Sequence, residues 1–149
     1  MKRMMILLVV LLLDIHLYSQ DSLPFITNLG EKQKATFGDA VTLFMYATNK
    51  APRGFAKDST MLKESGILTG MDYEEQRPLR RGMIARMVAR YMHLTGSLLY
   101  NIFGTERYAY VACIQARIMD PDASEWDILS GEELIEVISR MTGTTEEAE

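Results

Sequence analysis

Three arginines have the chemistry and the spacing of an anion-binding site. Arg77, Arg80 and Arg81 gather at the predicted start of a helix. A helix N-terminus carries a partial positive charge, so cations there are unfavourable unless an anion or a carboxylate lies beside them. Guanidinium groups form strong charge-assisted hydrogen bonds with such partners. We therefore expect this cluster to accept an anionic glycan or an acidic protein segment. Arg86 and Arg90, one helical turn apart and opposite the apolar stripe, are instead expected to form a solvated face with salt bridges to nearby acids.

Aromatic residues near predicted loops are the second group of candidates, and Tyr73 and Trp126 are selected from them. Saccharide rings stack on aromatic faces, and protein interfaces are also rich in tyrosine and tryptophan. Trp126 can instead fix its loop to the core, which needs no ligand, and we prefer that interpretation. The predicted ligand-binding residues are Arg77, Arg80, Arg81, Tyr73 and Trp126.

Residues suited to catalysis or metal binding are sparse. Beyond the first 20 residues the chain has one histidine, His93, and its single cysteine is Cys113. This pair offers no zinc-site spacing, and neither a nucleophile elbow nor a glycine-rich phosphate loop occurs. Acids such as Glu132 and Glu133 are adjacent in sequence, which does not place them across a substrate. We expect no enzyme activity, no metal and no cofactor; a small hydrolase with an unfamiliar site is the enzymatic alternative.

The composition is that of one ordinary globular domain. The chain has 149 residues, of which 48% are hydrophobic and 24% charged, enough for a single core. Its net charge of −4 leaves no basic face for nucleic acid. One cysteine cannot form an internal disulfide, so Cys113 is expected to be buried as a small apolar residue.

The N-terminus has the organisation of a secretory signal. Lys2 and Arg3 precede the apolar run 4–13, and the small residue Ser19 follows. This run is too short to span a bilayer, so no stable membrane insertion is expected after cleavage. Residues 1–20 are predicted to be a signal peptide, although a charged residue and a histidine after the run leave an uncleaved leader open. We expect export to the periplasm or to a bacterial cell surface.

Three later stretches share one apolar pattern and predict successive helices. They begin at Thr36, Arg80 and Ser130, a spacing typical of repeats with variable loops. Apolar residues recur in each at i, i+3, i+4 and i+7. Thr36 with Asp39 and Ser130 with Glu133 are capping boxes, whereas Arg80 cannot cap in this way. The residues that match in the middle of each stretch should share one apolar interior: Phe44, Val88 and Ile138.

Shorter elements are predicted between these stretches. Helices are expected at 57–65 and 106–117, and a turn of helix at 96–103. Residues 21–34 contain turn formers and predict an extended lead-in, and the acidic residues 143–149 predict a solvated tail. The expected fold class is all-α, with helix–loop–helix repeats packed as one small bundle over residues 35–142.

These repeats resemble the S-layer homology domain, a module of bacterial cell envelopes. A repeat of that family has a short helix ending in a Gly-Ile-x-x-Gly turn, a loop with a proline, and a helix opening Ile-Thr-Arg-Ala-Glu-Phe. Residues 62–70, Leu-Lys-Glu-Ser-Gly-Ile-Leu-Thr-Gly, are similar to the turn, and 78–90 to the loop exit and second helix. A fainter copy covers 112–119 and 128–140, and the stretch from Thr36 resembles the closing helix of an incomplete first copy.

The resemblance implies about three repeats that attach non-covalently to a cell-wall glycan, either a secondary polymer or peptidoglycan. It implies that the arginine of the Thr-Arg-Ala-Glu turn helps to bind an anionic polymer between repeats. Only Arg81 matches that arginine, because Phe37 and Gly131 stand there in the other copies, and residues 71–77 replace the family's aspartate-glycine loop. The expected function is binding of cell-wall polymer or peptidoglycan by a non-enzymatic envelope protein. The alternative is a periplasmic structural or adaptor subunit that binds another envelope protein.

Overall fold

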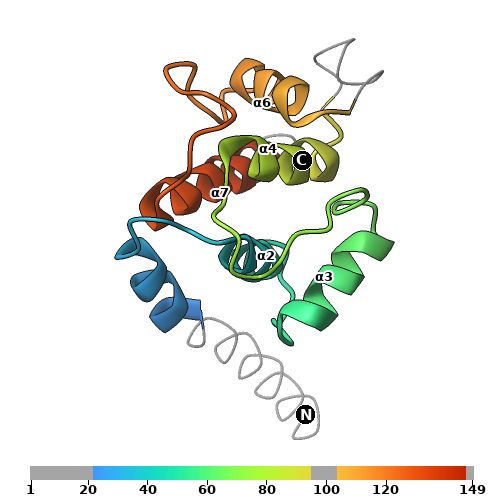
Figure 1. The fold of residues 1–149 in the computed structure, drawn as a ribbon, viewed down its shortest axis with the longest axis vertical. Coiled ribbons are helices and arrows are strands. Elements are labelled where there is room, and N and C mark those ends of the chain that lie inside the picture. The colour runs from blue at the N-terminus through green and yellow to red at the C-terminus, as the bar shows by residue number, and fades with distance from the viewer. Residues whose placement is uncertain (1–21, 95–103, 147–149) are drawn as a thin grey trace, which may run out of the picture.

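The computed structural model of the chain describes residues 22–94 and 104–146, and within these ranges it is an all-α bundle without strands (Figure 1). This confirms the predicted fold class. None of the described helices is long and apolar enough to cross a membrane. In chain order, a helix at 22–30 is followed by α2 (Phe37–Ala47), α3 (Phe55–Glu64), α4 (Arg81–Tyr91), α6 (Glu106–Gln115) and α7 (Gly131–Glu146).

The three long helices, α2, α4 and α7, begin where the repeat pattern predicted. Each starts one residue after the first residue of its stretch: Thr36, Arg80 or Ser130. Thr36 and Asp39 form a capping box. The N–H of Ser130 donates to Glu133 at 2.8 Å, and the N–H of Glu133 donates to the Ser130 hydroxyl at 3.2 Å. Arg80 makes no side-chain cap. The prediction that the middle helix starts differently is confirmed.

A ring of three backbone hydrogen bonds joins the residues just before these caps. The N–H of Ala35 donates to the carbonyl of Leu129 (2.8 Å), that of Leu129 to Leu79 (3.0 Å), and that of Leu79 to Ala35 (2.9 Å). All three residues are fully buried. The ring gives the three repeats a cyclic arrangement, because each copy is bonded to both of the others.

The first turns of the long helices also connect the copies in a cycle, with the donors running in the opposite sense to those of the ring. The first N–H groups of a helix have no partner within it. Here each first N–H donates to a carbonyl of the loop that precedes the next long helix in the cycle. These bonds, of 2.8, 2.9 and 2.8 Å, run from Phe37 to Arg77, from Arg81 to Asp127 and from Gly131 to Lys32. The last of them joins the third copy to the first and closes the circle.

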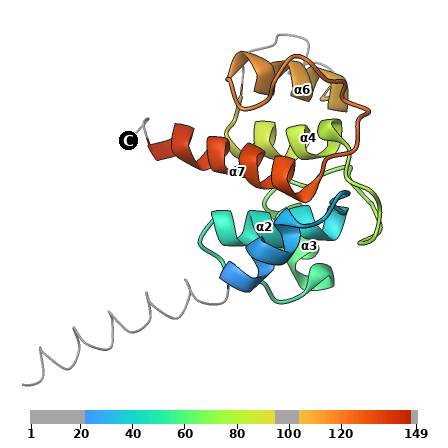
Figure 2. The same cartoon turned by 90° about the vertical axis from the view of Figure 1, so that its left-hand side faces the viewer.

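Each long helix also packs against the short helix of the next copy. α2 packs on α3, and α4 packs on α6. α7 meets the helix 22–30, where Leu29 is buried and its carbonyl lies against Gly131. Figure 2 shows this short helix, in blue, beside α2 and beneath α7. The predicted common interior is confirmed, since one buried cluster contains Phe44, Val88 and Ile138.

Two predicted boundaries are wrong. Residues 22–30 are helical, whereas an extended lead-in was expected over 21–34. Phe25, Ile26 and Leu29 form an apolar face at helical spacing. Burial of that face against the bundle outweighs the turn formers that suggested an extended chain. The first copy therefore has a short helix of its own.

The C-terminal correction has a similar cause. Residues 143–146 continue α7 beyond the predicted end of the helical domain at residue 142, although Gly143 and Thr144 are exposed, as expected for the start of a solvated tail. The buried side chain of Met141 anchors this last part of the helix, and the hydroxyl of Thr144 donates to the carbonyl of Arg140 at 2.8 Å. The predicted turn of helix at 96–103 and the predicted signal peptide at 1–20 lie outside the described residues.

Candidate functional site

Three of the five predicted ligand-binding residues line one surface pocket of about 470 Å³. It lies between the loop before α4 and the loop before α7, which an isolated bridge between Arg80 and Ile128 holds side by side. We call it the Arg80–Trp126 pocket, and its lining residues are Glu74, Gln76, Arg77, Pro78, Arg80, Trp126 and Ile128. It therefore sits at the junction of the second and third copies.

Arg80 lies between an aromatic ring and a carboxylate. Its guanidinium carbon is 4.8 Å from the centroid of the Trp126 ring, within the range of a cation–π contact. On its other side, Nη2 is 3.0 Å from one oxygen of Glu106 and 3.1 Å from the other. Trp126 itself is 63% exposed. The pocket thus presents a flat, accessible indole held in place by a fixed cation.

Tyr73 forms a second layer behind the pocket. Its hydroxyl donates to Glu106 at 2.7 Å, and its ring lies 5.1 Å below the guanidinium of Arg77. Burial, together with the hydrogen bond to the Glu106 carboxylate, raises the pKa of the Tyr73 phenol above its ordinary value. Phe37 packs edge-on against the same ring at 5.3 Å. Tyr73 therefore supports Arg77 and Glu106 without lining the pocket.

Arg81 points to a different part of the molecule. It forms an ion pair with Glu133, and its side chain is only 14% exposed. This pair lines a separate small cavity against α7, together with Glu136 and Arg140. Burial raises the pKa of Glu133, but hydrogen bonds from Ser130 and the charge of Arg81 outweigh burial, and the net pKa is lowered.

Two of the three arginines at the start of α4 thus have carboxylate partners within the chain. Glu106 pairs with Arg80, and Glu133 pairs with Arg81. Such partners offset the unfavourable placement of cations at a helix N-terminus. An external anion is not needed to explain the placement of Arg80 and Arg81.

The preferred interpretation of Trp126 as a core clamp is wrong, because most of its surface is exposed. Tyr110 fixes this loop instead. Its ring is buried, and its hydroxyl donates to the carbonyls of Asp120 (2.7 Å) and Ala123 (3.0 Å). The loop can therefore leave its tryptophan at the surface.

Glu106 is the site residue that sequence reasoning missed. It is the first residue of α6, and it connects Tyr73 and Arg80 from two other segments. Its partners lie 33 and 26 residues away in sequence. The only signal was an acidic residue at the start of a helix, which is common for reasons of helix stability alone.

The remaining reactive groups have structural surroundings. Cys113 is buried as predicted, and burial raises the pKa of its thiol to about 12. His93 is exposed just after α4 with a positive φ of 51°. Arg90, expected on a solvated face, donates to the carbonyls of Ile67 (3.1 Å) and Thr69 and so holds the turn after α3. Among the described residues, no group of three His, Cys, Asp or Glu could hold a metal ion.

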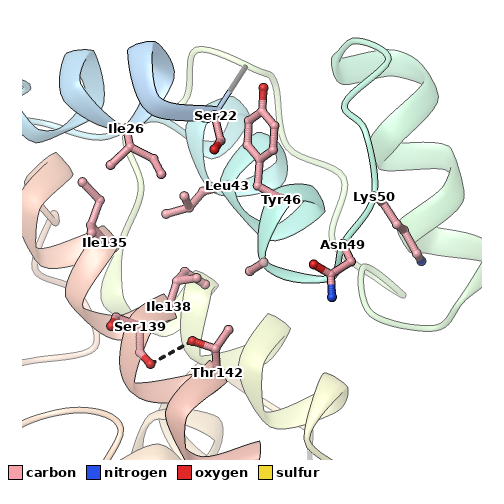
Figure 3. Close-up of a pocket in the computed structure, with 11 residues that line it drawn as sticks. Ser22, Ile26, Leu43, Tyr46, Asn49, Lys50, Ile135, Ile138, Ser139 and Thr142 are labelled. Atoms are coloured by element: carbon pink, nitrogen blue, oxygen red, sulfur yellow. Dashed lines mark hydrogen bonds between the residues drawn. The ribbon is translucent and has the colours of Figure 1, made fainter. Parts of the chain in front are cut away.

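A second, larger cavity of about 630 Å³ lies where the first and third copies meet. Figure 3 shows Ile26, Leu43, Ile135 and Ile138 converging on it from helix 22–30, α2 and α7. Polar residues such as Asn49, Lys50 and Ser139 also line it. This apolar groove contains none of the predicted ligand-binding residues.

Comparison with protein-family models, with curated proteins and with solved structures found no match to the chain.

Proposed function

We propose that the protein is an exported, non-enzymatic cell-envelope module that binds a cell-wall glycan, peptidoglycan or another wall polymer, in the Arg80–Trp126 pocket. The resemblance of its repeats to S-layer homology domains supports the class of ligand. The signal-like N-terminus supports export.

The observation that carries the proposal is the exposure of Trp126 beside an oriented guanidinium. Exposure of an indole to water is unfavourable, and burial of the ring against a ligand recovers that free energy. Here Arg80 lies over the ring, and the apolar side chains of Ile128 and Pro78 line the same pocket. A sugar ring stacks on such a face through its C–H groups, while nearby polar side chains bind its hydroxyls.

Retention on purified bacterial sacculi tests the proposal. We expect the full chain to sediment with sacculi, and Trp126→Ala and Arg80→Gln to reduce retention at least about tenfold, as expected for residues at the centre of a binding site. Arg81→Gln is the matched control, because it removes a neighbouring arginine that faces Glu133 outside the pocket. Equal retention of wild type and Trp126→Ala would contradict the proposed site.

The apolar groove favours a second candidate function, that of an adaptor for another envelope protein. An apolar helix with a polar edge fits a groove of this composition. Ile26→Glu places a charge on the groove wall and leaves the Arg80–Trp126 pocket intact. If the protein is an adaptor, Ile26→Glu abolishes capture of the partner and Trp126→Ala does not; a wall-binding module gives the opposite pattern with sacculi.

A further inference from the structure

The charges around the Arg80–Trp126 pocket indicate which kind of saccharide it accepts; this inference rests on the proposed function. The positive charge of Arg80 is compensated within the molecule, because Glu106 lies 3.0 Å from it. The side chains of both residues are largely buried, at 21% and 14% exposure. A ligand carboxylate or phosphate would have to compete with Glu106 for this guanidinium.

The second cation of the pocket, Arg77, shares the lining with one carboxylate. Arg77 lies over Tyr73, and Glu74 lines the same pocket. The two guanidinium groups of the pocket thus have two carboxylates near them: Glu74 in the lining, and Glu106, which is paired with Arg80 outside the lining. Arg81, the remaining member of the predicted cluster, is paired with Glu133 elsewhere and adds no free positive charge.

The surrounding loops carry an excess of acid. Residues 72–78 and 122–128 contain a single basic residue, Arg77, and six acidic ones: Asp72, Glu74, Glu75, Asp122, Glu125 and Asp127. Asp72 is paired with Lys63 at 2.7 Å, which leaves the other five in excess. Most of these side chains are exposed. Exposed charges act over a screening length of about 10 Å at moderate salt, which exceeds the width of one sugar residue. A polyanion approaching this junction would meet net repulsion.

The uncharged features of the pocket are well suited to a sugar. Trp126 and Ile128 are exposed apolar residues, and Gln76 offers both a donor and an acceptor. We propose that the pocket binds an uncharged saccharide chain and discriminates against anionic wall polymers. The sequence predicted an anionic partner for the arginine cluster. In the structure Arg80 and Arg81 are instead paired with Glu106 and Glu133 of the same chain.

Trp126 provides a direct probe, since it is the only tryptophan of the chain. The full chain is titrated with the tetramer of N-acetylglucosamine and with the tetramer of galacturonic acid, following tryptophan emission. We expect the neutral tetramer to bind with a Kd that changes less than about twofold between about 20 mM and 500 mM NaCl, because no charge is screened. The anionic tetramer is expected to bind at least about tenfold more weakly at low salt.

A charge variant serves as the matched test. Glu75→Gln with Asp122→Asn removes two exposed carboxylates that lie outside the pocket lining. We expect it to strengthen binding of the anionic tetramer a few-fold and to leave the neutral tetramer unchanged. Tighter binding of the anionic tetramer by wild type, lost at high salt, would overturn the inference.

The outcomes separate this inference from the proposed function. If sacculi retain the protein through Trp126 but the neutral tetramer does not bind, the inference of an uncharged saccharide is wrong and the proposed wall binding is supported. Binding of the neutral tetramer without any retention on sacculi supports the saccharide class and removes the wall as its source. Capture of a peptide or protein through Trp126, with no response to either sugar, overturns both.

Discussion

Arg117 adopts a left-handed backbone conformation, and the residue at the equivalent position of the second copy is a glycine. Gly66 follows α3 with φ 84°, and Arg117 follows α6 with φ 60°. The two positions begin equivalent turns, Gly66-Ile67-Leu68 and Arg117-Ile118-Met119, whose later residues are buried. A residue with a Cβ is disfavoured in this conformation, and glycine is not.

Exchanging these residue types should therefore have opposite effects on stability. We expect Arg117→Gly to raise the free energy of unfolding by about 1 kcal/mol and Gly66→Arg to lower it by about the same amount. Urea denaturation of the two variants measures both. A loss of stability in Arg117→Gly would show that its side chain contributes more than its backbone strain costs.

Glu133 predicts a pH dependence of stability. Its pKa is lower in the folded chain than in the unfolded one, so folding favours the ionised form. Its contribution is fully present above the unfolded pKa, which is about 4.3. It is lost as the pH falls through the lower, folded value. Glu133→Gln should therefore flatten the acid side of a plot of thermal midpoint against pH, and an unchanged acid limb would contradict the assignment.

At the scale of helices, glycine permits the close approach between copies. A Cβ on Gly131 would lie 1.7 Å from the carbonyl oxygen of Leu29, whereas a Cβ on Gly143 in the same helix would meet nothing within 4 Å. We expect Gly131→Ala to cost at least about 3 kcal/mol or to prevent folding, because backbone must move to admit the methyl group.

Gly143→Ala is the internal control for this prediction. It should stabilise the protein by up to about 1 kcal/mol, since alanine is the better helix former and no contact opposes it. Thermal melts of the two single variants compare them directly. Similar behaviour of both variants would mean that α7 does not meet the helix 22–30 as described.

Helix positions were predictable from the sequence where the signals are local. Thr36 and Ser130 have capping partners three residues on, and the apolar spacing continues from each cap. The helix 22–30 was missed because its stability comes from burial of Leu29 against a helix about 100 residues later. The turn formers there favoured an extended chain over the short apolar spacing of Phe25, Ile26 and Leu29.

Sequence reasoning found only part of the site, and the geometry at the start of α4 explains why. Arg80 is the extended residue before α4, and Arg81 is the first helical residue, so adjacent side chains leave in different directions. Arg80 meets Trp126, and Arg81 meets Glu133. Neither the division of the cluster nor the role of Glu106 follows from residue types and spacing, because both depend on contacts between copies.

At the scale of the whole molecule, three junctions share one backbone plan and differ in their side chains. Counting back four residues from each cap gives Lys32, Gln76 and Trp126. Lys32 is engaged in an ion pair with Asp39 at 2.7 Å. Of these three residues only Trp126 is aromatic, and its ring lies against Arg80, the residue just before α4. The cyclic scaffold is thus repeated, and the candidate site belongs to one junction.

Closure of the three copies into a ring positions that junction. Hydrogen exchange of the three ring amides, those of Ala35, Leu79 and Leu129, tests it most directly. Their N–H groups are buried and bonded from copy to copy, so each can exchange only when the ring opens. We expect one common free energy of exchange for all three, equal to that of global unfolding. Exchange of the Ala35 amide at a markedly lower free energy than the other two would show that the first copy does not close the ring.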